Sequence, residues 1–162
     1  MTYRVLQTDI QHVRADALIT AINPQGLWFG GIDGAIQRCA GDQFHDQARG
    51  AAPLEDGQTV VARKRAPHFG RWEDVVFVVD ALQMPLDQLV ERALRAAEQA
   101  GYVSVVMPAI RTGLTLECVE GSLEETVALF RQGTTRHFDR VGTPQVTVVV
   151  YHNPRLYHLL VQ

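Results

Sequence analysis

Six short runs of apolar residues along the chain predict six β-strands. They span residues 3–8, 17–22, 60–65, 75–79, 103–107 and 146–151. Residues 17–22 are nearly all apolar, which is typical of a strand covered on both faces. Residues 3–8 alternate between apolar and polar, as a half-buried strand does.

Apolar residues at helical spacing predict helices between these strands. The most regular pattern begins after Pro85, places Leu86, Leu89, Val90, Ala93, Leu94 and Ala97 on one face, and ends at Gly101. Other helices are predicted from near Asp33 to Gly41 and over residues 42–49, 119–131 and 154–160, with 131–144 as a long surface loop. Strands that alternate with helices, without repeat or linker, predict one α/β sandwich domain with a mixed sheet over residues 1–162.

Composition narrows the class of protein. With 162 residues, 20% charged residues and a net charge of −3, the chain has no general attraction for nucleic acid or anionic membranes. No apolar run approaches the ~20 residues that cross a bilayer. Cys39 and Cys118 form no C-x-x-C pattern and Met1 leads directly into a strand, so we expect a cytoplasmic protein with free thiols. The basic segment 63–71 is better explained as a solvated connection than as a docking patch.

Three loops follow the carboxyl ends of predicted strands: residues 23–34 (loop one), residues 108–118 (loop two) and the turn after Tyr151. Ligands of open α/β sheets bind at this edge. Gly30-Gly31 and Thr112-Gly113 each precede a helix, where backbone N–H groups can approach a phosphate closely. Neither loop is a Walker A or a G-x-G-x-x-G motif. On spacing alone, turn glycines without a ligand remain the commoner explanation.

Loop one belongs to a pattern that extends over nearly the whole chain. DALITAIN at 16–23, GGIDGAI at 30–36 and Ala40-Gly41 are followed by MPAIRTGL at 107–114. Thr8-Asp9-Ile10 precedes them, and a Val-rich strand ending at Tyr151 comes last. In this order they resemble the macrodomain signature: G-D-I, D-A-I-V-N-A-A-N, a glycine run, V-D-G-A-I, A-A-G and F-P-A-I-S-T-G-I. Each motif is common by itself, but the ordered combination is specific.

The resemblance implies a three-layer α/β/α sandwich with a mixed, largely parallel sheet that binds ADP-ribose, free or attached to a macromolecule. Asp9 would accept a hydrogen bond from the adenine amino group, and Tyr151 would stack on the ring. Their alternatives are a solvated strand-end carboxylate and an ordinary strand aromatic. The remaining family contacts fall on backbone and side chains of both loops and nearby strands: Ile10, Ala21, Gly30, Gly31, Ile32, Ala109, Thr112, Gly113, Leu114 and Thr115.

Asn23 and Asp33 lie ten positions apart (33 − 23), as in hydrolytic members of the MacroD type. There the Asn holds the distal ribose, and the Asp positions or activates water near the anomeric carbon. Both residues also have structural explanations. Asp33 suits a helix N-cap, and Asn23 before Pro24 suits a turn. This interpretation requires no metal and no cofactor.

The sequence also departs from the family pattern. Thr20 stands in place of an Asn, and Trp28 and Phe29 stand in place of the first glycines of the run. Arg111 replaces a Ser and would either contact a phosphate or lie on the surface. Residues 115–116 replace an aromatic-Gly pair that covers the distal ribose, and Cys118 replaces a Pro. We therefore expect Phe29 or Trp28 to supply the missing cover.

Three functions are compatible with these residues. The first is an enzyme that removes ADP-ribose from a modified side chain or hydrolyses a related ester such as O-acetyl-ADP-ribose. The second is a module that binds ADP-ribose without turnover, and the third is a domain for another nucleotide or an RNA end. The retained Asp33 favours the enzyme, because simple binding does not need it. We expect a monomer without membrane or general nucleic-acid partners.

Overall fold

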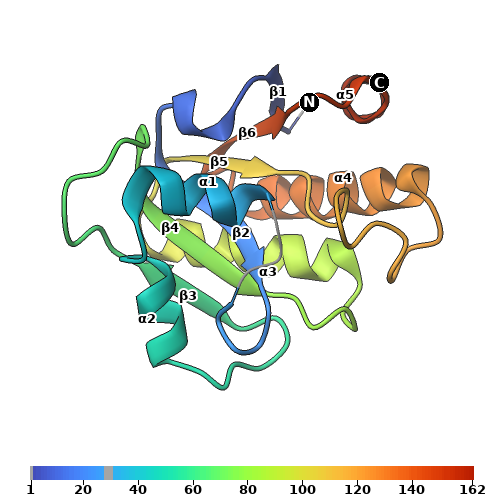
Figure 1. Ribbon diagram of the computed structural model, residues 1–162. Coiled ribbons are helices and arrows are strands. Elements are labelled where there is room, and N and C mark those ends of the chain that lie inside the picture. Colours follow the sequence, from blue (N-terminus) through green and yellow to red (C-terminus); the bar gives the residue numbers. More distant parts are fainter. Residues whose placement is uncertain (1, 28–30) are drawn as a thin grey trace.

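The computed structural model describes residues 2–27 and 31–162. In these residues six strands alternate with helices (Figure 1). The elements in chain order are β1 (Arg4–Gln7), the short 3-10 helix η1 (Ile10–His12), β2 (Ala15–Ile22), α1 (Gly31–Ala40), α2 (His45–Gly50), β3 (Thr59–Ala62), β4 (Trp72–Val79), α3 (Leu86–Gln99), β5 (Ser104–Pro108), α4 (Leu123–Arg140), β6 (Gln145–Val150) and α5 (Pro154–Val161). All six predicted strands are confirmed.

The strands form one sheet in the order β1-β6-β5-β2-β4-β3. Every neighbouring pair is parallel except β3 and β4, which pair antiparallel at one edge. In the centre, Leu18 of β2 pairs with Val75 of β4 on one side and Val106 of β5 on the other. The mixed, largely parallel sheet is the one that the sequence predicted.

Helices cover both faces of the sheet, which gives three layers. Ala17 and Ile19 of β2 pack with the buried residues of α3, α4 and α5. Leu18 and Ile22, which alternate with them, pack with those of η1, α1 and α2. Figure 1 shows α1 and α2 in front of the sheet, and α3 and α4 behind it. The apolar run in β2 follows from this double coverage.

The predicted helix at 119–131 is confirmed over residues 123–131, but the predicted surface loop at 131–144 is wrong, because residues 131–140 are helical. The helix α4 starts at Leu123, where the hydroxyl of Ser122 accepts a hydrogen bond from the Glu125 N–H, and it continues to Arg140. Its buried face beyond Phe130 consists of Gly133, Thr134 and His137. These residues have helical spacing but are small or polar, so an apolar pattern does not reveal them.

Gly133 of α4 packs closely against α3. A Cβ at this position would lie 2.6 Å from the Asp87 carbonyl oxygen and 3.0 Å from Val90 Cβ. We expect Gly133→Ala to lower the free energy of unfolding by about 1–3 kcal/mol through overpacking. This loss outweighs the better helix propensity of alanine, which is at most ~1 kcal/mol. Urea denaturation followed by circular dichroism measures the change.

Gly50 provides the matched control, because a Cβ there meets nothing within 4 Å. Gly50→Ala is expected to leave the stability unchanged or to raise it slightly. A Gly133→Ala variant that unfolds at the same urea concentration as the parent would contradict the close packing of α3 on α4.

Candidate functional site

A pocket of about 520 Å³ opens at the carboxyl ends of the parallel strands. That volume falls within the range of small-molecule sites. Its described walls come from the ends of β1, β2, β4, β5 and β6, the start of α1, loop two and the turn after β6. The three loops that the sequence singled out therefore meet at one edge of the sheet, as predicted.

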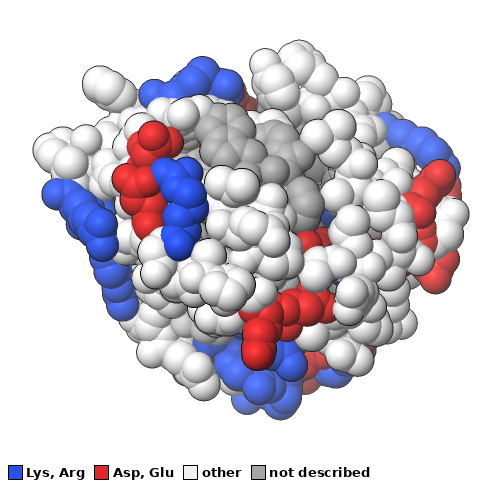
Figure 2. Space-filling view, turned by 60° about the horizontal axis from the view of Figure 1, so that its bottom comes forward, with Lys and Arg blue, Asp and Glu red and all other residues white. Residues whose placement is uncertain are grey.

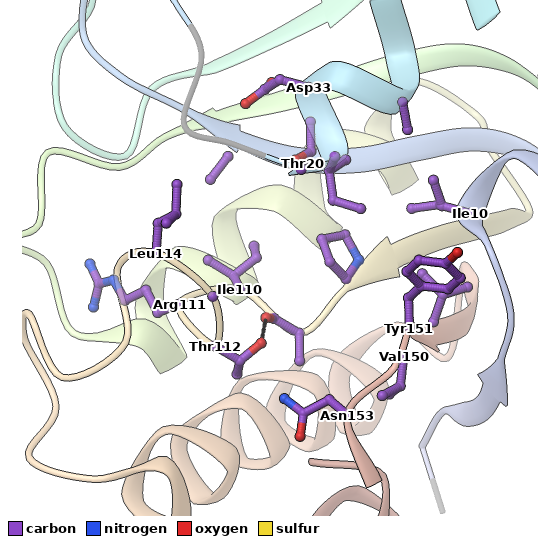
Figure 3. A pocket seen from close by; sticks show the side chains of 18 of the residues that line it. Ile10, Thr20, Asp33, Ile110, Arg111, Thr112, Leu114, Val150, Tyr151 and Asn153 are labelled. Carbon is purple, nitrogen blue, oxygen red and sulfur yellow. Dashed lines mark hydrogen bonds between the residues drawn. The ribbon is translucent and has the colours of Figure 1, made fainter. Parts of the chain in front are cut away.

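The pocket is elongated along this edge. β1 and β6 are neighbours at one side of the sheet, whereas β2 and β4 lie toward the other. Figure 3 shows Tyr151 and Ile10 toward one end and Leu114 and Arg111 toward the other. Asp33 and Thr20 lie on one side of the pocket and Thr112 and Asn153 on the opposite side (Figure 3). A long ligand with chemically different ends fits this shape.

The end at β1 and β6 combines an open aromatic ring with a carboxylate. The Tyr151 side chain follows β6 and is 63% exposed, so one of its faces is accessible for stacking. Asp9 Oδ1 accepts a hydrogen bond from the Gln11 N–H at 3.1 Å and thereby caps η1. Both residues line the pocket, together with the buried Ile10. This is the arrangement that recognition of an aromatic amine requires.

The middle of the pocket is lined by small residues and backbone. Gly31 and Ile32, at the start of α1, form one wall. A helix N-terminus presents N–H groups and a partial positive charge, both of which favour an anion. Across from it, the Thr112 hydroxyl donates to the Ala109 carbonyl at 2.6 Å and shapes loop two before Gly113. The wall also includes the predicted residues Ala21, Leu114 and Thr115.

Arg111 is the largest departure of the structure from expectation. Its side chain is 1% exposed, so the alternative of a surface position is wrong, whereas the contact with a phosphate stays a prediction. Nε and Nη2 donate to both oxygens of Asp80 at 3.0 and 2.8 Å, and Nη1 donates to Glu120 Oε2 at 3.0 Å. Nη2 also donates to the Met84 carbonyl at 2.7 Å. The guanidinium thus ties loop two to the segment that follows β4.

The charge of this cluster follows from its surroundings. Burial alone would lower the pKa of the Arg111 guanidinium, but hydrogen bonds and charge from Asp80, and then from Glu120, raise its pKa above the ordinary value. Arg111 therefore stays a cation between two carboxylates. A buried charge is tolerated only when it is paired, so the guanidinium must stay next to Asp80 and Glu120. This requirement fixes the backbone of loop two at Arg111, which has a left-handed φ of 65°.

Asp33 lies in the wall of the pocket but is nearly covered, with 2% of its surface exposed. Its Oδ1 is 2.9 Å from Nε2 of His45, a buried residue at the start of α2. The alternative of a helix N-cap is wrong, because α1 already begins at Gly31. The carboxylate is thus held below the surface of the pocket, on the side of α1.

The structure shows Asn23 as a turn residue. Its Oδ1 accepts hydrogen bonds from the N–H groups of Gln25 at 3.0 Å and Leu27 at 2.9 Å. Asn23 is not among the described residues that line the pocket. The structure therefore brings Asp33 to the wall but not its predicted partner. The predictions for Trp28, Phe29 and Gly30 concern residues that lie outside the described part of the chain, so the substitute cover stays a prediction.

The polar residues of the wall that were not predicted as site residues include Arg38, Asp80 and Asn153. Arg38 follows Gly31 by seven positions in α1 and so shares its face, a spacing that was available as a signal. Asn153 precedes Pro154 and caps α5 by accepting from the Leu156 N–H at 3.1 Å. Asp80 directly follows β4, but only the folded chain reveals its pairing with Arg111.

The surface carries no extended field of one sign on the face that Figure 2 shows, where basic and acidic groups alternate among uncharged residues. Within residues 2–27 and 31–162, no helix has the length and apolar character to cross a membrane. The same residues contain no group of three or more His, Cys, Asp or Glu side chains arranged to hold a metal ion.

Comparisons with known proteins agree with this geometry. The Macro domain family profile matches residues 19–117. The O-acetyl-ADP-ribose deacetylase of Escherichia coli strain K12 is 30% identical over an alignment 172 residues long. The alignment covers 96% of this chain and 93% of that protein. The ADP-ribose glycohydrolase MACROD1 of Rattus norvegicus is 28% identical, and the match covers 92% of this chain but 60% of the rat protein.

Solved structures share the fold at lower identity. The Trypanosoma brucei macrodomain in complex with ADP-ribose superimposes with a TM-score of 0.80 at 18% identity. The superposition covers 96% of this chain and 66% of the trypanosome chain. The chain thus spans about two thirds of that structure, and somewhat less of the rat protein.

Removal of the Arg111 charge tests the buried cluster. Arg111→Met leaves Asp80 and Glu120 buried without their cation, so we expect a loss of about 3–5 kcal/mol in the free energy of unfolding. Urea denaturation measures this loss. Arg136→Met is the control, since Arg136 pairs with Asp87 and Glu91 at the surface and a small change is expected. Equal stability of the two variants would show that Arg111 does not anchor loop two.

Proposed function

Because this chain belongs to the macrodomain family, we propose that its pocket binds ADP-ribose and that the protein hydrolyses an ADP-ribosyl linkage or an ADP-ribose ester. One observation carries the proposal: a single elongated pocket joins the Asp9–Tyr151 end, the start of α1 and the carboxylate of Asp33. The Escherichia coli and rat relatives are named as hydrolases of such compounds, which supports the reaction class.

The ligand is placed by matching its chemistry to the walls. Adenine lies at the β1 and β6 end, where the Asp9 carboxylate accepts from its amino group and Tyr151 offers a ring face. The diphosphate lies in the middle, between the start of α1 and the backbone at Gly113. The distal ribose then falls near Asp33 and Thr20.

Asp33 would orient the attacking water. In cleavage of a glycosidic ester, the water oxygen forms a bond to the anomeric carbon, the bond from that carbon to the target oxygen breaks, and the water proton passes to the departing carboxylate or to Asp33. Asn23 would hold the distal ribose through its Nδ2 donor, since its Oδ1 is used by the turn of loop one. That contact requires the Asn23 amide to reach the ligand from outside the described wall of the pocket.

A binding module without turnover is the second candidate. Asn23 lies outside the described wall, and Asp33 is nearly covered and held by His45. Both observations favour a site that recognises ADP-ribose and leaves the linkage intact. Binding alone depends on the adenine end, the start of α1 and loop two, and does not need the carboxylate of Asp33.

The adenine end is tested through Tyr151. Tyr151→Ala should weaken ADP-ribose binding by about 1–3 kcal/mol, which is roughly 5- to 150-fold in Kd, because a stacking face is lost. Tyr151→Phe keeps the face and should bind within about twofold of the parent. Isothermal titration calorimetry measures both. Unchanged affinity in the alanine variant would place adenine elsewhere.

The reaction is tested with mono-ADP-ribosylated protein and with O-acetyl-ADP-ribose, while free ADP-ribose is followed by chromatography. We expect release by the native chain, and for Asp33→Asn a loss of kcat of about 10²-fold or more, the range for a positioned general base. Calorimetry on the same samples should show that Asp33→Asn still binds ADP-ribose. Binding without release by the native chain would identify the module instead, and absence of binding would exclude both functions.

A further inference from the structure

The structure places a buried histidine against the candidate catalytic carboxylate, on the side away from the pocket. We propose that His45 is a positioning residue, which holds Asp33 in the orientation needed to direct water. This inference rests on the proposed hydrolysis. His45 is not among the described residues of the wall, whereas Asp33 is, so His45 acts on the reaction through Asp33.

His45 occupies a position where an apolar residue would suit the surroundings. Its neighbour Phe44 and the following Ala48 are core residues of the layer formed by α1 and α2, and all three are 0% exposed. The imidazole lies against the Phe77 ring of β4, with ring centroids 4.9 Å apart and tilted by 57°. A polar ring in such an environment is retained when it has a specific polar partner.

Asp33 supplies that partner. Nε2 of His45 lies 2.9 Å from Asp33 Oδ1, and the two side chains are 1% and 3% exposed. Solvent is therefore excluded from the contact, which strengthens it relative to a surface pair. The bond joins the first turn of α1, at the pocket, to α2, which does not reach the pocket in the described residues.

The helix α2 is itself fixed, so it can serve as an anchor. Gln47 Nε2 donates to the Arg63 carbonyl at 2.8 Å, and the Arg63 N–H donates to Gln47 Oε1 at 3.0 Å. This pair of bonds ties α2 to the chain beyond β3. Because Phe77 packs against the ring and these bonds fix α2, the His45 side chain has little freedom to move. Its contact with Asp33 therefore restricts the orientation of the carboxylate.

The test replaces His45 in two ways. His45→Leu removes the hydrogen-bond donor but fills much of the space, and His45→Gln keeps a donor of similar reach. We expect kcat for ADP-ribose release to fall about 10- to 100-fold in His45→Leu, as for a misplaced catalytic group. His45→Gln should recover at least part of this loss, and the KM and the Kd for ADP-ribose should stay within about threefold in both variants because the ligand does not touch His45.

Phe44→Leu is the matched control. Phe44 is equally buried and precedes His45, but its ring packs on Trp72 and His68 rather than on Asp33. Assayed below its melting temperature, this variant should keep the native kcat. The double variant Asp33→Asn/His45→Leu should be no slower than Asp33→Asn alone, because a residue that acts through Asp33 adds nothing once the carboxylate is gone.

The outcomes separate this inference from the proposed function. If the native chain and His45→Leu release ADP-ribose at the same rate while Asp33→Asn does not, His45 has no positioning role and the hydrolysis stands. A faster His45→Leu would mean that the pair holds Asp33 away from the reaction, and an equal loss in Phe44→Leu would reduce the effect to packing; either result overturns the inference. No release by the native chain rejects both proposals.

Discussion

The constraint on which this molecule depends is the burial of a parallel strand, β2, on both of its faces. A parallel neighbour can be reached only by a crossover, and the crossovers here carry the helices that cover the sheet. Every loop that follows a parallel strand therefore lies at the same edge of the sheet, the edge of the carboxyl ends. The pocket is a consequence of that topology, because it gathers residues from the ends of five strands that are far apart in the chain.

Two buried polar contacts support the walls of the pocket, one at Arg111, where the sequence departs from its family pattern, and one at the retained Asp33. Arg111 anchors loop two through its ion pairs with Asp80 and Glu120. His45 contacts Asp33 on the side away from the pocket. Both contacts lie in low-dielectric surroundings, where the loss of one partner lowers the free energy of unfolding strongly. The side chains are therefore held in one geometry. Loop two thus has a buried arginine in place of the small Ser of the family pattern. Leu114, also in loop two, lines the pocket and is 82% exposed.

The sequence predicted what local patterns encode. Apolar runs located all six strands, helical spacing located α3, and the ordered motifs located most of the described wall. It did not predict the second half of α4, since the buried face there is Gly133, Thr134 and His137. Nor did it predict the partners of Arg111, which lie 31 and 9 positions away. For Asn23 the sequence left two roles open, and the structure shows the turn. Such pairings become visible only when the chain is folded.

The central claim is that one ligand spans the pocket from Tyr151 to Asp33. A crystal structure with bound ADP-ribose tests it most directly. We predict adenine between Asp9 and Tyr151, the diphosphate at the start of α1, and the distal ribose near Asp33. One water molecule should bridge this ribose and the Asp33 carboxylate, with each hydrogen bond about 2.6–3.2 Å long. A ligand bound outside this pocket, or one with its distal ribose directed away from Asp33, would contradict it.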